Sequence, residues 1–136
     1  MNINYNGVRY LFLKGAIMIL KGIRGATTAD DNSEKEILKK TNKLLTEIME
    51  RNNLKKEYIA SIFFTMTEDL DAEFPALAAR QMGWTEVPLL CAREIKIKES
   101  LKQCIRVLIH YNADKNFDVE HVYLNKAKAL RKDLSK

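Results

Sequence analysis

The stretch SEKEILKKTNKLLTEIMER, residues 33–51, is the most regular pattern in the chain and decides how the rest can fold. One face of it is formed by positions at helical spacing: Ile37, Leu38, Thr41, Leu44, Leu45, Ile48 and Met49. Asn32 or Ser33 can cap its start, and Glu36, three residues after Ser33, completes a capping box. The pattern predicts an amphipathic helix over 34–51 whose apolar face packs on another element, such as a β-sheet.

The segments on either side of this helix are typical of β-strands. Strands are expected at 18–22, 58–66, 87–92, 104–111 and 121–129. A turn over 112–118 separates the last two, which can pair as a hairpin. A second helix is expected over 74–82, with Pro75 in its first turn and Gly83 ending it in the left-handed conformation. The sequence therefore predicts an α+β fold in which helices cover a mixed β-sheet.

The length of 136 residues favours one domain with one apolar core. The segment 8–20 is largely apolar, but Arg9 and Lys14 interrupt it and it is too short to span a bilayer. We expect residues 1–17 to be a dispensable extension and residues 18–136 to form the domain, with Met18 a plausible start.

The charge balance argues against nucleic-acid and membrane partners. The chain carries a net charge of +5, but without Arg9 and Lys14 the domain has 21 basic and 18 acidic residues, scattered among one another. No basic stripe of the kind that binds nucleic acid is formed. A small anionic ligand fits this modest excess better.

Cysteine and histidine are too few, and too far apart in sequence, to indicate metal or nucleophilic chemistry. Cys91 and Cys104 form no CxxC pattern, and His110 and His121 are the two histidines. Neither a metal site nor a Ser-His-Asp triad is predicted. Cysteine usage of this kind is typical of a reduced, cytoplasmic setting.

Several short motifs, in a fixed order, identify a family. They are Lys21-Gly-Ile-Arg-Gly-Ala-Thr-Thr28, Phe74-Pro-Ala76 with Arg80, Gly83-Trp84 with Val87-Pro88, Cys91 with Glu94, Cys104-Ile-Arg-Val107, His121-Val-Tyr-Leu124 and Leu130-Arg131. Over about residues 18–134 the chain resembles the AroH-class chorismate mutases. The resemblance implies a pseudo-α/β-barrel homotrimer that needs no cofactor or metal and rearranges chorismate to prephenate in pockets between subunits, in the biosynthesis of phenylalanine and tyrosine.

The resemblance also implies a role for individual residues. Arg106 would face the ether oxygen of the breaking bond, and Glu94 would accept the substrate's ring hydroxyl. Arg24 and Tyr123 would hold substrate carboxylate, because an arginine fork grips a carboxylate through two charge-assisted hydrogen bonds. The remaining pocket residues would close the mouth or form the wall: Arg80, Arg131, Phe74, Ala76, Leu90, Cys91 and Leu130.

Two positions depart from the family pattern. Leu77 stands where many relatives carry a lysine near the pocket entrance, and Lys132 stands where relatives often have proline. The first change removes a cationic guide for an anionic substrate. The second loosens the tail that presents Arg131.

The residues taken singly have simpler interpretations. Arg106 can point to the solvated face of an apolar strand, because strand side chains alternate. Tyr123 can cap a sheet edge, Glu94 can be a surface acid, and the Arg24 segment can be a glycine-rich turn. Three other functions are compatible with a protein of this size: a trimeric metabolite-sensing module without activity, a trimeric deaminase-like enzyme and a nucleic-acid binder. The presence of Arg106 and Glu94 favours the mutase.

Overall fold

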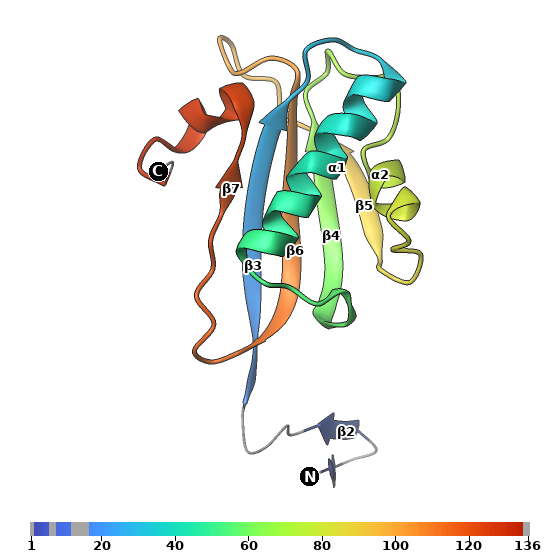
Figure 1. The fold of residues 1–136 in the computed structure, drawn as a ribbon, viewed down its shortest axis with the longest axis vertical. Coiled ribbons are helices and arrows are strands. Elements are labelled where there is room, and N and C mark those ends of the chain that lie inside the picture. Colours follow the sequence, from blue (N-terminus) through green and yellow to red (C-terminus); the bar gives the residue numbers. More distant parts are fainter. Residues whose placement is uncertain (1, 6–7, 12–16, 135–136) are drawn as a thin grey trace.

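The computed structural model describes residues 2–5, 8–11 and 17–134. A five-stranded mixed sheet, in the order β5-β4-β6-β3-β7, forms its centre (Figure 1). The elements of the domain are β3 Met18–Thr28, α1 Glu34–Arg51, η1 Lys56–Tyr58, β4 Ile59–Met66, α2 Ala76–Gln81, β5 Leu89–Arg93, β6 Cys104–Asp114, β7 Val122–Tyr123 and η2 Asn125–Arg131. The predicted α+β fold with a mixed sheet is confirmed.

The long strand β6 lies in the middle of the sheet and fixes its register. β6 runs antiparallel to β3 on one side and to β4 on the other. The outer strands are parallel to their neighbours, β5 to β4 and β7 to β3. Side chains that are paired across these strands share a face, so the register determines which residues of different strands can meet.

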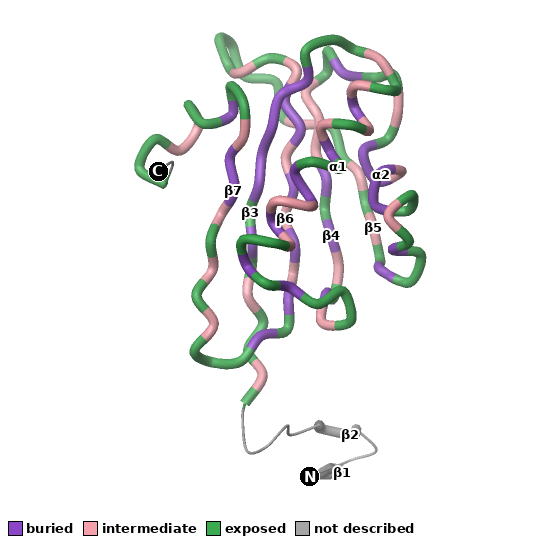
Figure 2. The backbone as a smooth tube through the Cα atoms, viewed as in Figure 1, coloured by how far each residue is buried: buried purple, intermediate pink, exposed green. Residues whose placement is uncertain are grey.

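The helix α1 covers one face of the sheet, as its stripe predicts (Figures 1 and 2). Its buried positions, Ile37, Thr41, Leu44, Leu45 and Ile48, belong to the predicted stripe. The Ser33 hydroxyl accepts a hydrogen bond from the Glu36 backbone N–H at 3.2 Å, which forms half of the capping box. The Glu36 carboxylate accepts from the Asp30 N–H at 3.1 Å instead of from Ser33, so it ties the helix start to the end of β3.

The close approach of α1 to the sheet depends on Gly25 in β3. A Cβ at this position would lie 2.6 Å from Ile48 Cδ1 and 3.1 Å from both Leu44 Cδ1 and Val107 Cγ1. The lack of a side chain here therefore serves packing rather than a turn, because an added methyl group would displace the Ile48 side chain. The interpretation of Arg24 as part of a glycine-rich turn is wrong, because Gly22 to Gly25 lies inside the continuous strand β3.

The expected strand over 121–129 and its hairpin with 104–111 are also wrong. Within 121–129 the paired strand is limited to Val122 and Tyr123, which pair in parallel with Gly25 and Ala26 of β3. Asn125 then takes a left-handed backbone conformation, φ 54°, and the helix η2 begins there. The pattern of alternating apolar residues could not distinguish a short strand followed by a 3-10 helix from one long strand.

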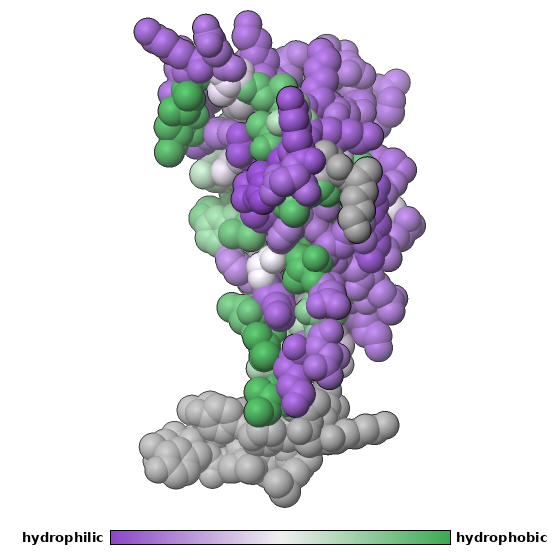
Figure 3. Space-filling model, turned by 90° about the vertical axis from the view of Figure 1, so that its left-hand side faces the viewer, coloured by the Kyte–Doolittle hydropathy of each residue, from purple (hydrophilic) through white to green (hydrophobic). Residues whose placement is uncertain are grey.

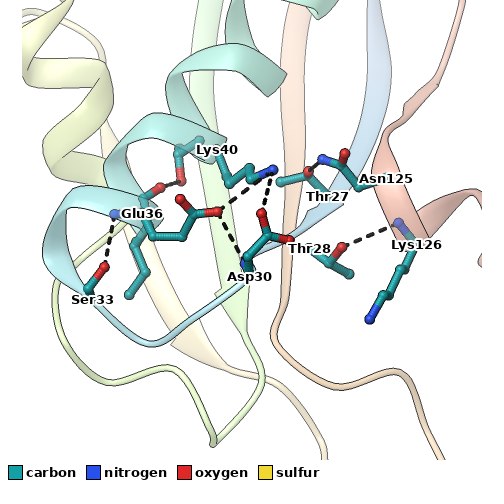
Figure 4. A network of polar contacts seen from close by, with 10 residues as sticks. Thr27, Thr28, Asp30, Ser33, Glu36, Lys40, Asn125 and Lys126 are labelled. Atoms are coloured by element: carbon teal, nitrogen blue, oxygen red, sulfur yellow. Dashed lines mark hydrogen bonds and ion pairs between the residues drawn. The ribbon is translucent and has the colours of Figure 1, made fainter.

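Side-chain hydrogen bonds hold η2 against the end of β3 (Figure 4). The Asn125 amide donates to Thr27 Oγ1 at 3.0 Å, and the Lys126 backbone N–H donates to Thr28 Oγ1 at 3.3 Å. These bonds come from two neighbouring threonines of β3. They place the residues of η2 beside the end of the sheet.

The segment before β3 contains two short strands, β1 Asn2–Tyr5 and β2 Val8–Leu11, which pair antiparallel with each other. The expectation that residues 1–17 are dispensable concerns a segment that lies partly outside the described residues. It stays a prediction. Among the described residues, no helix combines the length and the apolar character needed to cross a membrane.

Candidate active site

A row of four residues crosses the sheet on the face opposite α1. The strand register places Thr65 of β4 beside Arg106 of β6, Arg106 beside Ala26 of β3, and Ala26 beside Tyr123 of β7. Arg106 alternates along β6 with Ile105 and Val107, which are buried. Because those neighbours face the core, the guanidinium extends from the other face.

Arg106 forms an ion pair with Glu94 at the start of the row. Its Nη2 lies 2.6 Å from Glu94 Oε1, and the two side chains are 33% and 17% exposed. Glu94 directly follows β5, and its backbone N–H donates to the Met66 carbonyl at 2.9 Å. Thr65 Oγ1 lies 3.5 Å from the other carboxylate oxygen of Glu94. The carboxylate is therefore contacted by side chains from β6 and β4, and its backbone is tied to the end of β4.

Two polar atoms of the row are buried without a hydrogen-bond partner among the described residues. They are Arg106 Nε and the Tyr123 hydroxyl. An unmet buried donor costs about 1–3 kcal/mol, so such groups usually have a use. Between them stands Ala26, whose methyl group leaves space for both side chains. These atoms are suited to bind a ligand with oxygen acceptors.

Arg24 lies two residues before Ala26 on the same face of β3 and is exposed. Its backbone N–H donates to Nδ1 of His121 at 2.9 Å, which connects β3 to the residue just before β7. From η2, Leu130 packs on the cluster of Ala26, Cys104, Tyr123 and Ala127. Arg131 is half-buried and bonded to Asp133 through Nε at 3.0 Å and Nη2 at 2.7 Å.

The other predicted pocket residues lie around α2. Ala76 is buried within it, Arg80 is exposed near its end, and Phe74 just before it is 63% exposed. Cys91 pairs with Phe64 and packs against the core beneath the helices, whereas Leu90 pairs with Phe63 and is exposed on the opposite face. Within one chain the structure therefore brings together Arg24, Glu94, Arg106, Tyr123, Leu130 and Arg131, and it separates Phe74, Ala76, Arg80 and Cys91 from them.

Neither cysteine has the electrostatic setting of a nucleophile. Burial raises the pKa of Cys104 to about 11, against the lowering effect of Arg106. Burial also raises the pKa of Cys91. Both thiols are protonated near neutral pH, which favours a packing role. Among the described residues, no group of three or more His, Cys, Asp or Glu side chains is arranged to hold a metal ion.

Thr65 and His121 reach the site although the sequence did not single out either as functional. Thr65 follows Ser61 and Phe63 at a spacing of two along β4, and His121 precedes Tyr123 by two residues. Spacing of two in a strand is the signal that would have placed them on the face of Arg106. That signal is useful only when the register of neighbouring strands is known.

Comparison with known proteins identifies the family to which this chain belongs. A model of the chorismate mutase type I family matches residues 20–134. The chain belongs to the type I chorismate mutases. The chorismate mutase AroH of Bacillus subtilis (strain 168) is 45% identical over 120 residues, which are 87% of this chain and 94% of the relative. Chorismate mutase AroH of Thermus thermophilus is 46% identical over 118 residues, 85% of this chain and 97% of the relative.

A solved structure agrees with this assignment. A chorismate mutase from Clostridium thermocellum is 55% identical and superimposes with a TM-score of 0.78. The match covers 80% of this chain and 98% of that structure. The sheet and helices described above are therefore the fold of a chorismate mutase.

Proposed function

We propose that the sheet face carrying Arg24, Glu94, Arg106 and Tyr123 performs the family's reaction, the rearrangement of chorismate to prephenate. The reaction is intramolecular: one carbon–oxygen bond breaks while one carbon–carbon bond forms, and no atom enters or leaves. It requires neither a nucleophile nor a proton transfer. Positioning and fixed charge are enough to accelerate such a reaction.

The observation that carries this proposal is the half-buried pairing of Arg106 with Glu94 beside two buried polar atoms that have no partner among the described residues, Arg106 Nε and the Tyr123 hydroxyl. As the bond to the ether oxygen lengthens, negative charge develops on that oxygen, and the Arg106 guanidinium meets it. Arg106 Nε has no other partner among the described residues, so it can donate to the ligand. Glu94, 2.6 Å from Arg106, accepts the ring hydroxyl and stabilises the positive side of the transition state.

The two carboxylates of chorismate need cationic partners at a distance from the breaking bond. Arg24 and the Tyr123 hydroxyl hold one of them on the sheet face. Arg80 and Arg131 close the mouth of the pocket around the substrate. Phe74, Ala76, Leu90, Cys91 and Leu130 form the wall.

We propose further that each site is shared between two chains of a homotrimer. The sheet lies between the Arg106 face and the residues that pack with α2, so one chorismate cannot contact both sets in one chain. A second copy that brings its α2 to the Arg106 face would complete the pocket. The exposed apolar residues Leu20, Phe63 and Leu90, at 59%, 41% and 56% exposure, lie on this same face.

The surface distribution of apolar residues supports such an assembly. In the side view of Figure 3, hydrophobic side chains gather toward one side of the domain and hydrophilic ones cover the other. Association would bury apolar surface that is otherwise in contact with water.

We also propose a cytoplasmic location, with which the free thiols of Cys91 and Cys104 are compatible.

The test follows the loss of chorismate absorbance with purified protein in buffer containing a chelator. We expect activity in the wild type and a loss of about a hundredfold to a thousandfold in turnover for Arg106→Ala, the usual cost of removing one electrostatic donor. Lys39→Ala, which removes an exposed positive charge from α1 on the other side of the sheet, is the control and should retain activity. Activity that the chelator abolishes, or that survives Arg106→Ala, would contradict the proposal.

An inactive metabolite-sensing module of the same fold is the alternative. It would bind chorismate and leave it unchanged. The presence of Arg24, Glu94, Arg106 and Tyr123 argues against it, because loss of activity removes the constraint on those side chains. The same absorbance assay separates the two functions.

A further inference from the structure

His121 is the one side chain of the segment before β7 that contacts the backbone of a proposed substrate-binding residue. Its Nδ1 accepts the Arg24 backbone N–H at 2.9 Å. The register continues directly from this contact, because the next residues, Val122 and Tyr123, pair with Gly25 and Ala26. The imidazole therefore stands beside Arg24 where β3 and β7 first meet, two residues before Tyr123.

This hydrogen bond fixes the chemical form of the ring. Nδ1 can accept only when it carries no proton, so the neutral ring must carry its proton on Nε2. A protonated His121 would present an N–H to the N–H of Arg24. The bond would then be lost, because two donors cannot pair.

The charges around His121 favour the same neutral form. Burial first, then the Arg24 guanidinium of β3 and the Arg131 guanidinium of η2, lowers the pKa of His121 below its ordinary value of 6.5. The pocket that His121 and Tyr123 line also contains Arg51 from α1, Lys128 from η2 and the adjacent Glu120. Glu120 is the one acid among these groups, and it lies 3.9 Å from Arg51. A cationic imidazole would add a further positive charge to this set.

We propose that His121 is a positioning residue for the reaction: as a neutral acceptor through Nδ1, it holds Arg24 and Tyr123 at the spacing that binds one substrate carboxylate. This inference rests on the proposed function of Arg24 and Tyr123. His121 touches neither the breaking bond nor Arg106. Its loss should weaken substrate binding more than it slows the chemical step.

The KM for chorismate should rise on acidification and not on an increase in pH. Above pH 6.5 the ring is neutral and the bond is intact, so KM is at its minimum. As the pH falls through the lowered pKa of the folded state, the bond breaks and KM rises, while kcat changes little. The contribution of His121 to folding stability follows the same direction: it is present above pH 6.5 and is lost on acidification through that lower pKa.

Two variants separate acceptance of the hydrogen bond from simple packing. His121→Asn places an amide oxygen close to the position of Nδ1 and does not titrate. His121→Leu fills similar space without an acceptor. At pH 7.5 we expect His121→Leu to raise KM about tenfold, the equivalent of one hydrogen bond, with kcat within about twofold. We expect His121→Asn to keep KM near the wild-type value and to abolish its rise below pH 6.5.

Glu120→Gln is the matched control, because it changes the charge next to His121 and leaves the ring and its acceptor in place. It should keep the wild-type KM at pH 7.5, and its KM should still rise on acidification, at the same or a lower pH, because removal of an acid favours the neutral ring. Thermal denaturation of every variant checks that the fold persists. Equal KM values for His121→Leu and wild type, or equal increases in the Asn and Leu variants, would overturn the proposal.

Imidazole NMR supplies a readout that does not depend on catalysis. With ¹⁵N-labelled protein, His121 should show a pyridine-like Nδ1 and a protonated Nε2 at neutral pH, and His110→Gln assigns the signals because the chain has two histidines. A protonated Nδ1 would overturn the inference even if the enzyme is active. An inactive wild type with the expected tautomer would contradict the proposed function and leave the hydrogen bond established.

Discussion

At the scale of single residues, the site depends on a small side chain between two large ones. Ala26 is 1% exposed and lies between Arg106 and Tyr123 in the strand register. A larger residue in this place would fill the space over which the guanidinium and the phenol converge. The orphaned Nε and hydroxyl can therefore act on one ligand.

The hydroxyl of Thr65 is expected to orient Glu94. It lies 3.5 Å from Glu94 Oε2, and Arg106 pairs with the other oxygen. Thr65→Val removes this contact with almost no change in volume, and we predict a several-fold decrease in kcat, because one weak hydrogen bond contributes about 0.5–1.5 kcal/mol. Steady-state kinetics with Thr65→Ser, which keeps the hydroxyl, provides the control. A Val variant as fast as wild type would show that Arg106 alone orients the carboxylate.

Leu77 should limit the capture of substrate. It is half-buried in α2, three residues before Arg80, where a lysine would add positive charge near the proposed mouth. We predict that Leu77→Lys lowers KM for chorismate and leaves kcat largely unchanged, since a charge at the entrance acts mainly through steering and ground-state attraction. The decrease in KM should become smaller as salt is added. An unchanged KM at low salt would refute this role.

Individual residues also show what a sequence pattern can predict and what it cannot. Strand alternation establishes that Arg106 and Ile105 face opposite sides, but not which side is solvated. The structure decides this, because Ile105 and Val107 are 0% and 4% exposed on the helix side of the sheet. The resemblance to the family predicted the role of Arg106, whereas Thr65 and His121 required the register of the strands.

At the scale of elements, the close packing of α1 on β3 depends on Gly25, which has no side chain. Gly25→Ala would place a methyl group 2.6 Å from Ile48 Cδ1, and overpacking of this kind typically costs about 1–3 kcal/mol. We predict a lower free energy of unfolding for Gly25→Ala in urea titrations. The double variant Gly25→Ala/Ile48→Val removes the atom in conflict and should regain part of the loss. A double-mutant cycle without coupling would show that the two positions do not compete for space.

The elements differ in how far local sequence determines them. The helix α1 could be predicted with its bounds, 34–51, because capping residues and periodicity are local signals. The strand β7 could not, because its partner is β3, at the other end of the chain: the Arg24–His121 bond spans 97 residues. The turn of the chain after β7 depends on the left-handed backbone of Asn125 and on the threonine acceptors of β3, which no local pattern reveals.

Asn52 shows how the segment before β7 is positioned by a residue far away in the sequence. It is buried at the end of α1, where its amide donates to the Glu120 carbonyl at 2.8 Å and accepts from the Glu120 N–H at 2.7 Å. These two bonds hold the chain immediately before His121 and Tyr123. The end of the long helix thereby fixes where β7 can begin.

At the scale of the whole molecule, we propose that one chain presents two incomplete halves of a pocket. The Arg106 half lies on the sheet face opposite α1, and the Arg80 half lies around α2. Subunit association would bring the halves of neighbouring chains together and cover the apolar face. Activity should therefore depend on assembly, whereas the fold of each chain depends on its own core.

A subunit-mixing experiment tests most directly the claim that catalysis uses fixed charges from two chains. Arg106→Ala and Arg80→Glu each disable a different half, and each variant alone should be nearly inactive in the chorismate absorbance assay. In mixed trimers obtained by co-expression of both variants with different tags and purified through both tags, about a third of the sites should draw both intact arginines from two different chains, because one of the three interfaces in each mixed trimer pairs an intact Arg106 with an intact Arg80. The account predicts that activity returns to about that fraction of wild type, and mixed trimers as inactive as either parent would contradict it.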